Sequence, residues 1–203
     1  MLPVDTPHGV AHVHLRRVDE PRAALVLGHG AGGGVTSRDL VAVTDAALSE
    51  GVSVALVEQP YRVAGRRSPS PAHHLDGSWL AVVEELVADE LHGLRLIVGG
   101  RSLGARVACR TANATGAAAV LCLAFPLQPP RRRTGSTPVS RLAELELVRV
   151  PMLVVQGERD PFGIPPAAAR RKVIQVPGDH SLRTDDQAVA EAVRTWLRGG
   201  VRR

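Results

Sequence analysis

The sequence is poor in aromatic residues and in lysine. Aromatic side chains make up 2% of the 203 residues, and Lys172 is the only lysine among 25 basic residues. Proteins that bind nucleic acids usually combine basic patches with aromatic side chains that stack on bases. We therefore predict no nucleic-acid partner, in spite of the formal net charge of +5. The arginine excess is typical of a GC-rich coding sequence, and the run Arg131, Arg132 and Arg133 is the one basic cluster of note.

Cysteines and long apolar segments are also scarce. Cys109 and Cys122 are too few for a disulfide framework and lack the CxxC spacing of zinc sites. No apolar stretch reaches the ~18 residues that a membrane helix needs. The first residues lack the basic and then apolar pattern of a signal peptide. We therefore expect no membrane association, no metal and a cytoplasmic location.

Length and composition are those of a globular protein. The 203 residues are 44% hydrophobic and 22% charged. Domains average roughly 100–200 residues, so we expect a single domain over residues 1–203.

Short apolar runs alternate with segments of helical periodicity. Segment 10–18 alternates apolar and polar residues, as an antiparallel edge strand does. The last helix is expected to begin with a capping box of Thr184 and Gln187. The pattern predicts an α/β fold, a mostly parallel sheet flanked by helices on both faces. Further strands are predicted at 23–27, 52–57, 94–98, 118–124, 151–155 and 172–176, and helices at 39–50, 79–91, 103–111, 141–147 and 184–199.

A glycine-serine-glycine motif joins the predicted strand 94–98 to the predicted helix 103–111. Gly100, Ser102 and Gly104 fit the nucleophile elbow, a tight turn that lifts a serine hydroxyl clear of the backbone. Both glycines are expected because a Cβ there would collide with the neighbouring strand and helix. The alternative is a glycine-rich turn whose serine caps the next helix.

Two later strand ends carry the partners that a nucleophilic serine needs. Asp160 follows strand 151–155, and His180 follows strand 172–176. Because the carboxyl ends of parallel strands meet at one edge of a sheet, we expect both near Ser102. The order Ser, Asp, His is that of a catalytic triad on this topology. Glu158 and Asp179 are the neighbouring acidic alternatives to Asp160.

The remaining histidines give no metal-binding pattern. His12 and His14 share a strand face, and His73 and His74 are expected in a loop. Neither pair has a third ligand at metal spacing. We interpret these histidines as surface or packing residues.

The glycine-rich loop 28–34 has two interpretations. In a serine hydrolase, the backbone N–H of Ala31 would join that of Leu103 to bind an oxyanion. Alternatively, Gly28-x-Gly30-x-x-Gly33 matches a dinucleotide fingerprint, with Glu58 ending the next strand where a ribose-binding acid would lie. The next helix, however, is expected to start only near Ser37 or Arg38, too far along the chain to bind a pyrophosphate well.

Six segments in family order resemble the α/β-hydrolase superfamily: 28–34 (GHGAGGG), 58–62 (EQPYR), 99–106 (GGRSLGAR), 125–130 (FPLQPP), 155–163 (VQGERDPFG) and 177–182 (PGDHSL). They are most similar to a small cap-less branch that includes dienelactone-hydrolase-like bacterial proteins and the testis-expressed and histone-acetyltransferase (NSL) complex subunits of animals. The resemblance implies Ser102 as nucleophile, Asp160 as orienting acid and His180 as base, without a cofactor. Segment 125–141 is too short for the helical lid of many relatives.

These observations predict a serine hydrolase that acts on a small or polar ester or thioester through an acyl-enzyme. Candidate substrate contacts are His29, Gly30, Tyr61, Arg62 and Arg101. Arginines 62, 66 and 67, with those at 131–133, form either a positive rim for anionic substrates or solvated loop charges. Some animal members of the branch work as scaffold subunits, so a non-catalytic binding protein is the alternative.

Overall fold

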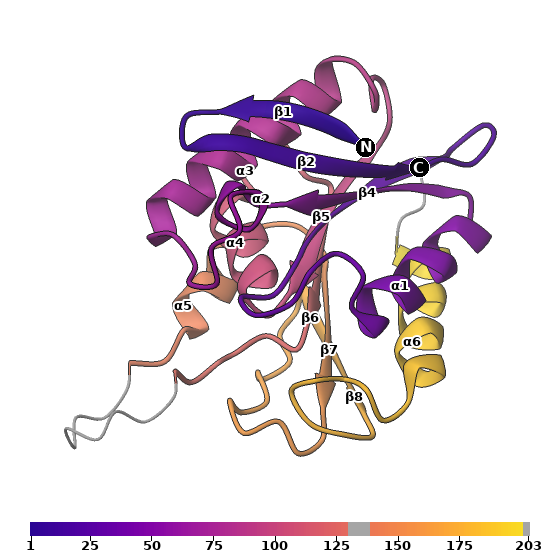
Figure 1. Cartoon of the computed structure of the whole chain (residues 1–203). Helices are drawn as coiled ribbons and strands as arrows, with labels where there is room; N and C mark the ends of the chain where they lie inside the picture. Colours follow the sequence, from indigo (N-terminus) through magenta and orange to yellow (C-terminus); the bar gives the residue numbers. More distant parts are fainter. Residues whose placement is uncertain (130–138, 201–203) are drawn as a thin grey trace.

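Eight strands form one sheet in the order β1-β2-β4-β3-β5-β6-β7-β8 (Figure 1). This computed structural model describes residues 1–129 and 139–200. β1 and β2 run antiparallel to their neighbours. The other six strands, β3 to β8, are all parallel to one another. The predicted mostly parallel sheet is therefore confirmed. The strands are β1 (Leu2–Thr6), β2 (Gly9–Arg16), β3 (Ala23–Gly28), β4 (Val52–Glu58), β5 (Leu96–Arg101), β6 (Ala119–Leu123), β7 (Met152–Gly157) and β8 (Arg171–Val176).

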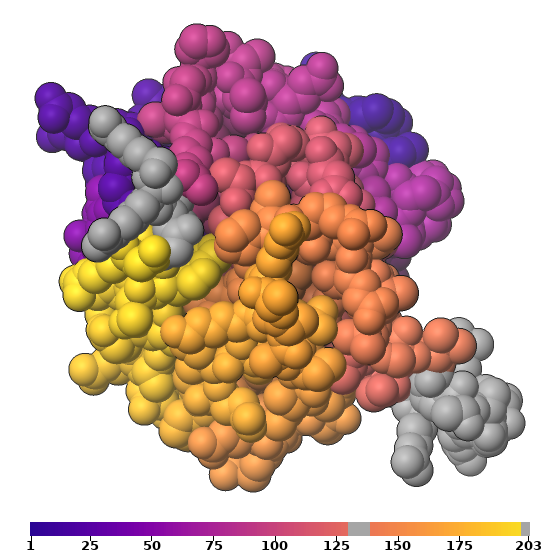
Figure 2. Space-filling model, turned by 180° about the vertical axis from the view of Figure 1, so that it is seen from behind, coloured from indigo at the N-terminus to yellow at the C-terminus, as the bar shows by residue number. Residues whose placement is uncertain are grey.

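Helices cover both faces of the sheet. α1 (Arg38–Ser49) and α6 (Asp186–Gly200) pack together on one face, and α3 (Ala72–Ala88) and α4 (Leu103–Thr111) pack together on the other (Figure 1). The short helices α2 (Pro60–Val63) and α5 (Leu142–Glu146) lie on the same side as α3 and α4. Seen from behind, the last part of the chain, orange to yellow, forms the lower part of the surface (Figure 2). No helix in the described part of the chain is both long and apolar enough to cross a bilayer.

The two faces of the central strands bury different side chains. Val26 and Val98 pack with Trp79 under α3 and α4, whereas Leu27 and Ile97 belong to the cluster under α1 and α6. Because strand side chains alternate between faces, a strand covered on both sides must be apolar at every position. This explains why β3 and β6 appear in the sequence as unbroken apolar runs.

The hairpin at the start of the chain corrects one prediction. Segment 10–18 was expected to be an edge strand, but β2 lies inside the sheet, between β1 and β4. The edge is β1, whose residues Leu2–Thr6 gave no separate strand signal. The alternation in β2 was interpreted correctly as antiparallel pairing, and the short strand that shields it was missed.

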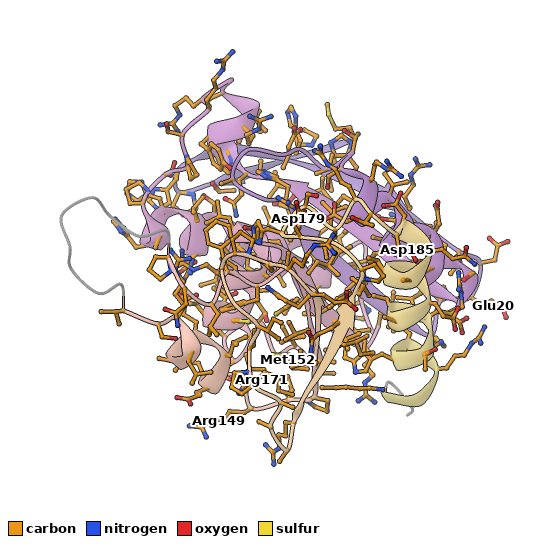
Figure 3. The ribbon with its side chains drawn as sticks, turned by 90° about the horizontal axis from the view of Figure 1, so that it is seen from below. Glu20, Arg149, Met152, Arg171, Asp179 and Asp185 are labelled. Atoms are coloured by element: carbon orange, nitrogen blue, oxygen red, sulfur yellow. The ribbon has the colours of Figure 1, made fainter. Side chains whose placement is uncertain are left out.

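Two helix starts also differ from the predictions. α3 begins at Ala72 and not at Trp79, so His73 and His74 belong to a helix and not to a loop. Its first two turns carry few apolar residues, so hydrophobic periodicity could not reveal them. At α6, the predicted capping box of Thr184 and Gln187 is wrong. Asp185 lies at the start of α6 (Figure 3). Its carboxylate accepts the N–H of Ala188 at 2.9 Å and caps the helix one residue later than predicted.

Three glycines hold the start of α4 against β3 and β5. A Cβ at Gly100 would lie 2.5 Å from the Gly28 carbonyl oxygen and 3.0 Å from the Gly104 Cα. A Cβ at Gly104 would overlap the same Gly28 oxygen. The collision expected from the sequence is therefore confirmed, and the close approach brings the loop after β3 next to the turn that carries Ser102.

Replacing Gly104 by alanine is expected to destabilise the fold by about 3 kcal/mol, because the obstructing atoms belong to backbone and overpacking of this kind costs 1–3 kcal/mol or more. Chemical denaturation would measure the loss. Gly199→Ala, in α6 with no atom near the added Cβ, is the matched control and should lose nothing. Equal stability of the two variants would contradict the packing described here.

Candidate active site

Three strand ends bring Ser102, Asp160 and His180 together. Ser102 follows β5, Asp160 follows β7, and His180 follows β8. His180 Nε2 lies 2.9 Å from Ser102 Oγ, and His180 Nδ1 lies 2.8 Å from Asp160 Oδ2. The Asp160 carboxylate is completely buried, whereas the His180 side chain is 18% exposed. The arrangement is a hydroxyl, an imidazole and a buried carboxylate joined in series.

Ser102 occupies a strained turn. Its φ of 52° and ψ of −102° lie outside the regions that residues with a side chain normally adopt. The Ser102 N–H donates to the carbonyl of Leu123 at 2.8 Å, and α4 begins at the next residue. The Ser102 hydroxyl makes no capping hydrogen bond to α4. The alternative interpretation, a serine that only caps the helix, is therefore not what the structure shows.

A network of donors surrounds the Asp160 carboxylate. Gln156 Nε2 donates to Oδ2 at 2.7 Å, and the Phe162 N–H donates to Oδ1 at 2.8 Å. Gln156 is fixed in turn, because its Oε1 accepts the Phe125 N–H at 2.9 Å and its Nε2 lies 3.1 Å from the Phe125 carbonyl. Sequence reasoning did not identify Gln156. The available signal was a single amide side chain inside the apolar strand β7, four residues before the acid.

Phe162 also shapes the other side of the imidazole. Its ring lies edge-on to the His180 ring, with centroids 4.5 Å apart. Phe162, which follows Pro161, therefore supplies both a backbone donor to Asp160 and an apolar contact for the His180 ring. These contacts leave the imidazole plane little room to rotate.

The loop after β3 is fixed by His29 and Tyr61. The His29 ring accepts the Gln59 N–H on Nε2 at 3.1 Å, which leaves Nδ1–H to donate to the Gly30 carbonyl at 2.8 Å. Burial lowers the pKa of His29, consistent with this neutral form. Burial also raises the pKa of Tyr61 to about 12, and its hydroxyl donates to the Ala31 carbonyl at 3.1 Å. Two of the predicted substrate contacts therefore hold the backbone around Ala31.

The same loop is bound to the serine turn. The Gly104 N–H donates to the His29 carbonyl at 3.1 Å. Among the loop and turn hydrogen bonds of the described residues, neither the Ala31 N–H nor the Leu103 N–H is a donor. The Leu103 N–H thus directly follows Ser102 in the chain, and the Ala31 N–H lies two residues after the His29 carbonyl that Gly104 binds.

Arg101 and Gly30 approach each other closely. A Cβ at Gly30 would lie 2.6 Å from Arg101 Nη1, so a larger residue there would force this guanidinium to shift. Arg101 Nε donates to Asp39 Oδ2 at 3.1 Å, and Nη2 donates to the His180 carbonyl at 3.0 Å. Arg101, predicted as a substrate contact, thus donates to two acceptors of the protein itself. The sequence analysis gave no role to Asp39.

The described arginines of the predicted rim, Arg62, Arg66 and Arg67, lie in and after α2, which follows β4. Arg62 is half-buried in α2, and among the described residues no hydrogen bond or ion pair joins it to Ser102 or His180. Arg66 and Arg67 are exposed after α2. The cluster Arg131 to Arg133 lies outside the described residues. Among residues 1–129 and 139–200, no group of three histidine, cysteine or acidic side chains is arranged to hold a metal ion.

The glycine fingerprint of loop 28–34 is poorly placed for a dinucleotide. α1 begins at Arg38, with Ser37 in the capping position, as the sequence predicts. The positive end of the helix therefore lies beyond the last fingerprint glycine, Gly33, and the phosphates would not meet it. Glu58, the expected ribose-binding acid, lies 3.6 Å from His14.

The fold and the geometry of this site define the class of α/β hydrolases. A sequence model described as "Alpha/beta hydrolase domain" matches residues 21–195. The chain belongs to that family. Within the described residues, no cap domain interrupts the sheet and its flanking helices. The predicted cap-less α/β-hydrolase fold is therefore confirmed.

Solved structures agree in fold at low sequence identity. Est1E from Butyrivibrio proteoclasticus, with bound ferulic acid, is 17% identical with a TM-score of 0.77, and covers 99% of both chains. Dienelactone hydrolase from Anabaena variabilis is 15% identical with a TM-score of 0.76, over 99% of this chain and 97% of that one. XC6422 from Xanthomonas campestris, described as a serine hydrolase without lid, is 17% identical with a TM-score of 0.74, over 97% and 92%. No curated protein sequence matched the chain.

Proposed function

We propose that the chain is a serine hydrolase that cleaves a small or polar ester or thioester through an acyl-enzyme. The observation that carries the proposal is the series of contacts from Ser102 Oγ to His180 Nε2 and from His180 Nδ1 to Asp160 Oδ2, at 2.9 and 2.8 Å. Membership of the α/β-hydrolase family supports it.

In the first half-reaction, His180 Nε2 takes the hydroxyl proton while Ser102 Oγ forms a bond to the carbonyl carbon. Asp160 holds the ring in the tautomer with the proton on Nδ1 and stabilises the imidazolium that forms. The imidazolium then returns its proton to the leaving alcohol or thiol as the carbon–oxygen or carbon–sulfur bond breaks. In the second half, water repeats the sequence on the acyl-enzyme and releases the acid.

The negative charge of the tetrahedral intermediate needs two fixed donors. We assign these to the backbone N–H groups of Leu103 and Ala31. Leu103 lies at the start of α4, where helix N–H groups have no partner within the helix. Ala31 is held by the Tyr61 hydroxyl through its carbonyl. Donors fixed before the reaction stabilise developing charge without reorganisation.

The open site favours small or polar acyl groups. Ser102 and His180 are both partly exposed, and no cap domain covers them within the described residues. A long acyl chain gains affinity by burying methylene groups at about 0.8 kcal/mol each, and an uncovered surface provides few such contacts. We therefore assign the enzyme to short or polar esters and thioesters.

A fluorophosphonate probe followed by peptide mapping tests the proposal on the intact protein. We expect a single adduct on Ser102, and faster hydrolysis of acetyl and butyryl esters than of octanoyl or longer ones. Ser181, beside His180, is the internal control and should carry no adduct. An unlabelled protein that binds a partner without turnover would instead support the scaffold interpretation, and thermal stabilisation by nicotinamide dinucleotides would support the fingerprint.

A further inference from the structure

Arg101 lies at the junction of three parts of the site. In the chain it directly precedes Ser102, and its guanidinium reaches the His180 carbonyl at 3.0 Å. The same group passes so close to Gly30 that a Cβ there would lie 2.6 Å from Nη1 and displace the guanidinium. One side chain therefore contacts the segment that holds the imidazole and the loop that holds Ala31, and is bonded through the backbone to the serine.

We propose that Arg101, held by Asp39, is a positioning residue that fixes the distance between His180 and Ser102. The inference rests on the proposed function only for its kinetic test. Arg101 is not a catalytic residue in this scheme, because it touches the backbone of His180 and none of the reacting atoms.

Two anchors are needed to place the His180 imidazole. Asp160 accepts from the ring at Nδ1 and sets its orientation. The backbone of His180 lies between Gly178, at φ 122°, and Leu182, at φ 51°, so the segment is an irregular turn without ladder hydrogen bonds at His180. The Arg101 hydrogen bond holds this turn from the side of the serine, and the Asp160 contact holds it from the side of β7.

Asp39 makes this anchor rigid. Its side chain is 2% exposed, and that of Arg101 is 17% exposed. Asp39 Oδ2 accepts from Arg101 Nε at 3.1 Å, and Oδ1 accepts the Leu40 N–H at 3.0 Å. The Arg101 guanidinium thus donates through Nε to Asp39 of α1 and through Nη2 to the His180 carbonyl. Lysine has no such fork and could not hold both acceptors in fixed directions.

The Arg101–Asp39 ion pair also adds no net charge beside His180. A lone arginine there would oppose the imidazolium that forms as His180 accepts the proton, because like charges at short range raise its free energy. The Asp39 carboxylate offsets the guanidinium locally. Arg101 can therefore supply a strong charge-assisted hydrogen bond to the His180 backbone without a large electrostatic cost to the reaction.

The test separates positioning from stability with a double variant. Arg101→Gln alone leaves the Asp39 carboxylate buried without its partner, which by itself destabilises a protein. Arg101→Gln combined with Asp39→Asn replaces the ion pair by two neutral amides, so that no buried charge is left without a partner. The matched control is Arg38→Gln, which removes a neighbouring exposed ion pair to Asp186 that does not reach the site.

We expect the double variant to keep the unfolding midpoint close to that of Arg38→Gln, while kcat falls about 100-fold with KM little changed, the loss typical of a reacting group misplaced by about 1 Å. The phosphonate labelling rate should fall by the same factor. Arg101→Lys should not restore either rate. A double variant with wild-type kcat and labelling rate would overturn the inference and leave the proposed function intact.

A readout without turnover keeps the two proposals distinguishable. The His180 Nδ1 proton, hydrogen-bonded to Asp160, is expected as a sharp downfield proton NMR resonance in the wild type and in Arg38→Gln. It should broaden or disappear in the double variant. If the wild type neither labels nor hydrolyses esters, the proposed function fails. Even then, a resonance unchanged in the double variant would overturn the positioning role, and a lost one would support it.

Discussion

Replacing Ser102 by alanine is expected to lower kcat for a short ester by about 10⁶-fold, the loss seen when a triad nucleophile is removed. Alanine keeps the Cβ and removes only Oγ, the atom 2.9 Å from His180 Nε2. Without it no acyl-enzyme forms, and covalent labelling by the phosphonate should disappear. Steady-state hydrolysis and mass spectrometry of the labelled protein measure the two effects.

The variant should fold as the wild type does. Alanine retains the same left-handed strain at φ 52°, so its unfolding midpoint should stay unchanged. Ser181→Ala is the control for loss of a hydroxyl near the base, because Ser181 Oγ donates to the Asp179 carboxylate and not to the triad. Hydrolysis that survives Ser102→Ala at the wild-type rate would rule out the proposed nucleophile.

The strained backbone of Ser102 explains how its hydroxyl is directed towards His180. A residue with a side chain at positive φ costs about 1–3 kcal/mol and persists only where the surroundings enforce it. Here the packing of Gly28, Gly100 and Gly104 enforces it. The turn is held in a conformation that is unfavourable for serine, and the result of that conformation is a hydroxyl directed at His180 Nε2.

The parallel sheet and its site were predictable because their signals are local. Each central strand is a short apolar run, since both of its faces are covered, and each flanking helix shows its own periodicity. In a parallel sheet the strand ends meet at one edge, so a polar residue after each run is placed in space by topology alone. This is why Ser102, Asp160 and His180 could be grouped although the chain separates them widely.

The supporting contacts could not be predicted because they join distant segments through side-chain geometry. Asp39 and Arg101 lie 62 positions apart, and no spacing rule connects them. Gln156 looks like an interruption of an apolar strand until its contacts with Asp160 and Phe125 are seen. At α3 and α6 the errors have a local cause, because polar first turns and two adjacent capping residues leave the helix start ambiguous.

These supporting contacts restrict what can replace Asp160. At Oδ2 the carboxylate faces two donors, Gln156 Nε2 at 2.7 Å and His180 Nδ1 at 2.8 Å, and at Oδ1 it faces the Phe162 N–H at 2.8 Å. Gln156 cannot turn its oxygen towards Asp160, because its Oε1 is held by the Phe125 N–H. All three of these hydrogen-bond partners therefore donate to the Asp160 carboxylate.

Asp160→Asn is consequently expected to lower kcat by about 10⁴-fold while the fold is retained. If the asparagine NH₂ group takes the Oδ2 position, it meets two donors and drives the His180 proton to Nε2, so that the ring can no longer accept from Ser102. If it takes the Oδ1 position, it opposes the Phe162 N–H and leaves no negative charge to stabilise the imidazolium. Steady-state kinetics with a short ester measure the loss, and Glu158→Gln, an exposed acid two residues earlier, is the control that should stay near the wild-type rate. An Asp160→Asn variant as active as that control would show that His180 works without this carboxylate, and the assignment of the orienting acid would have to be abandoned.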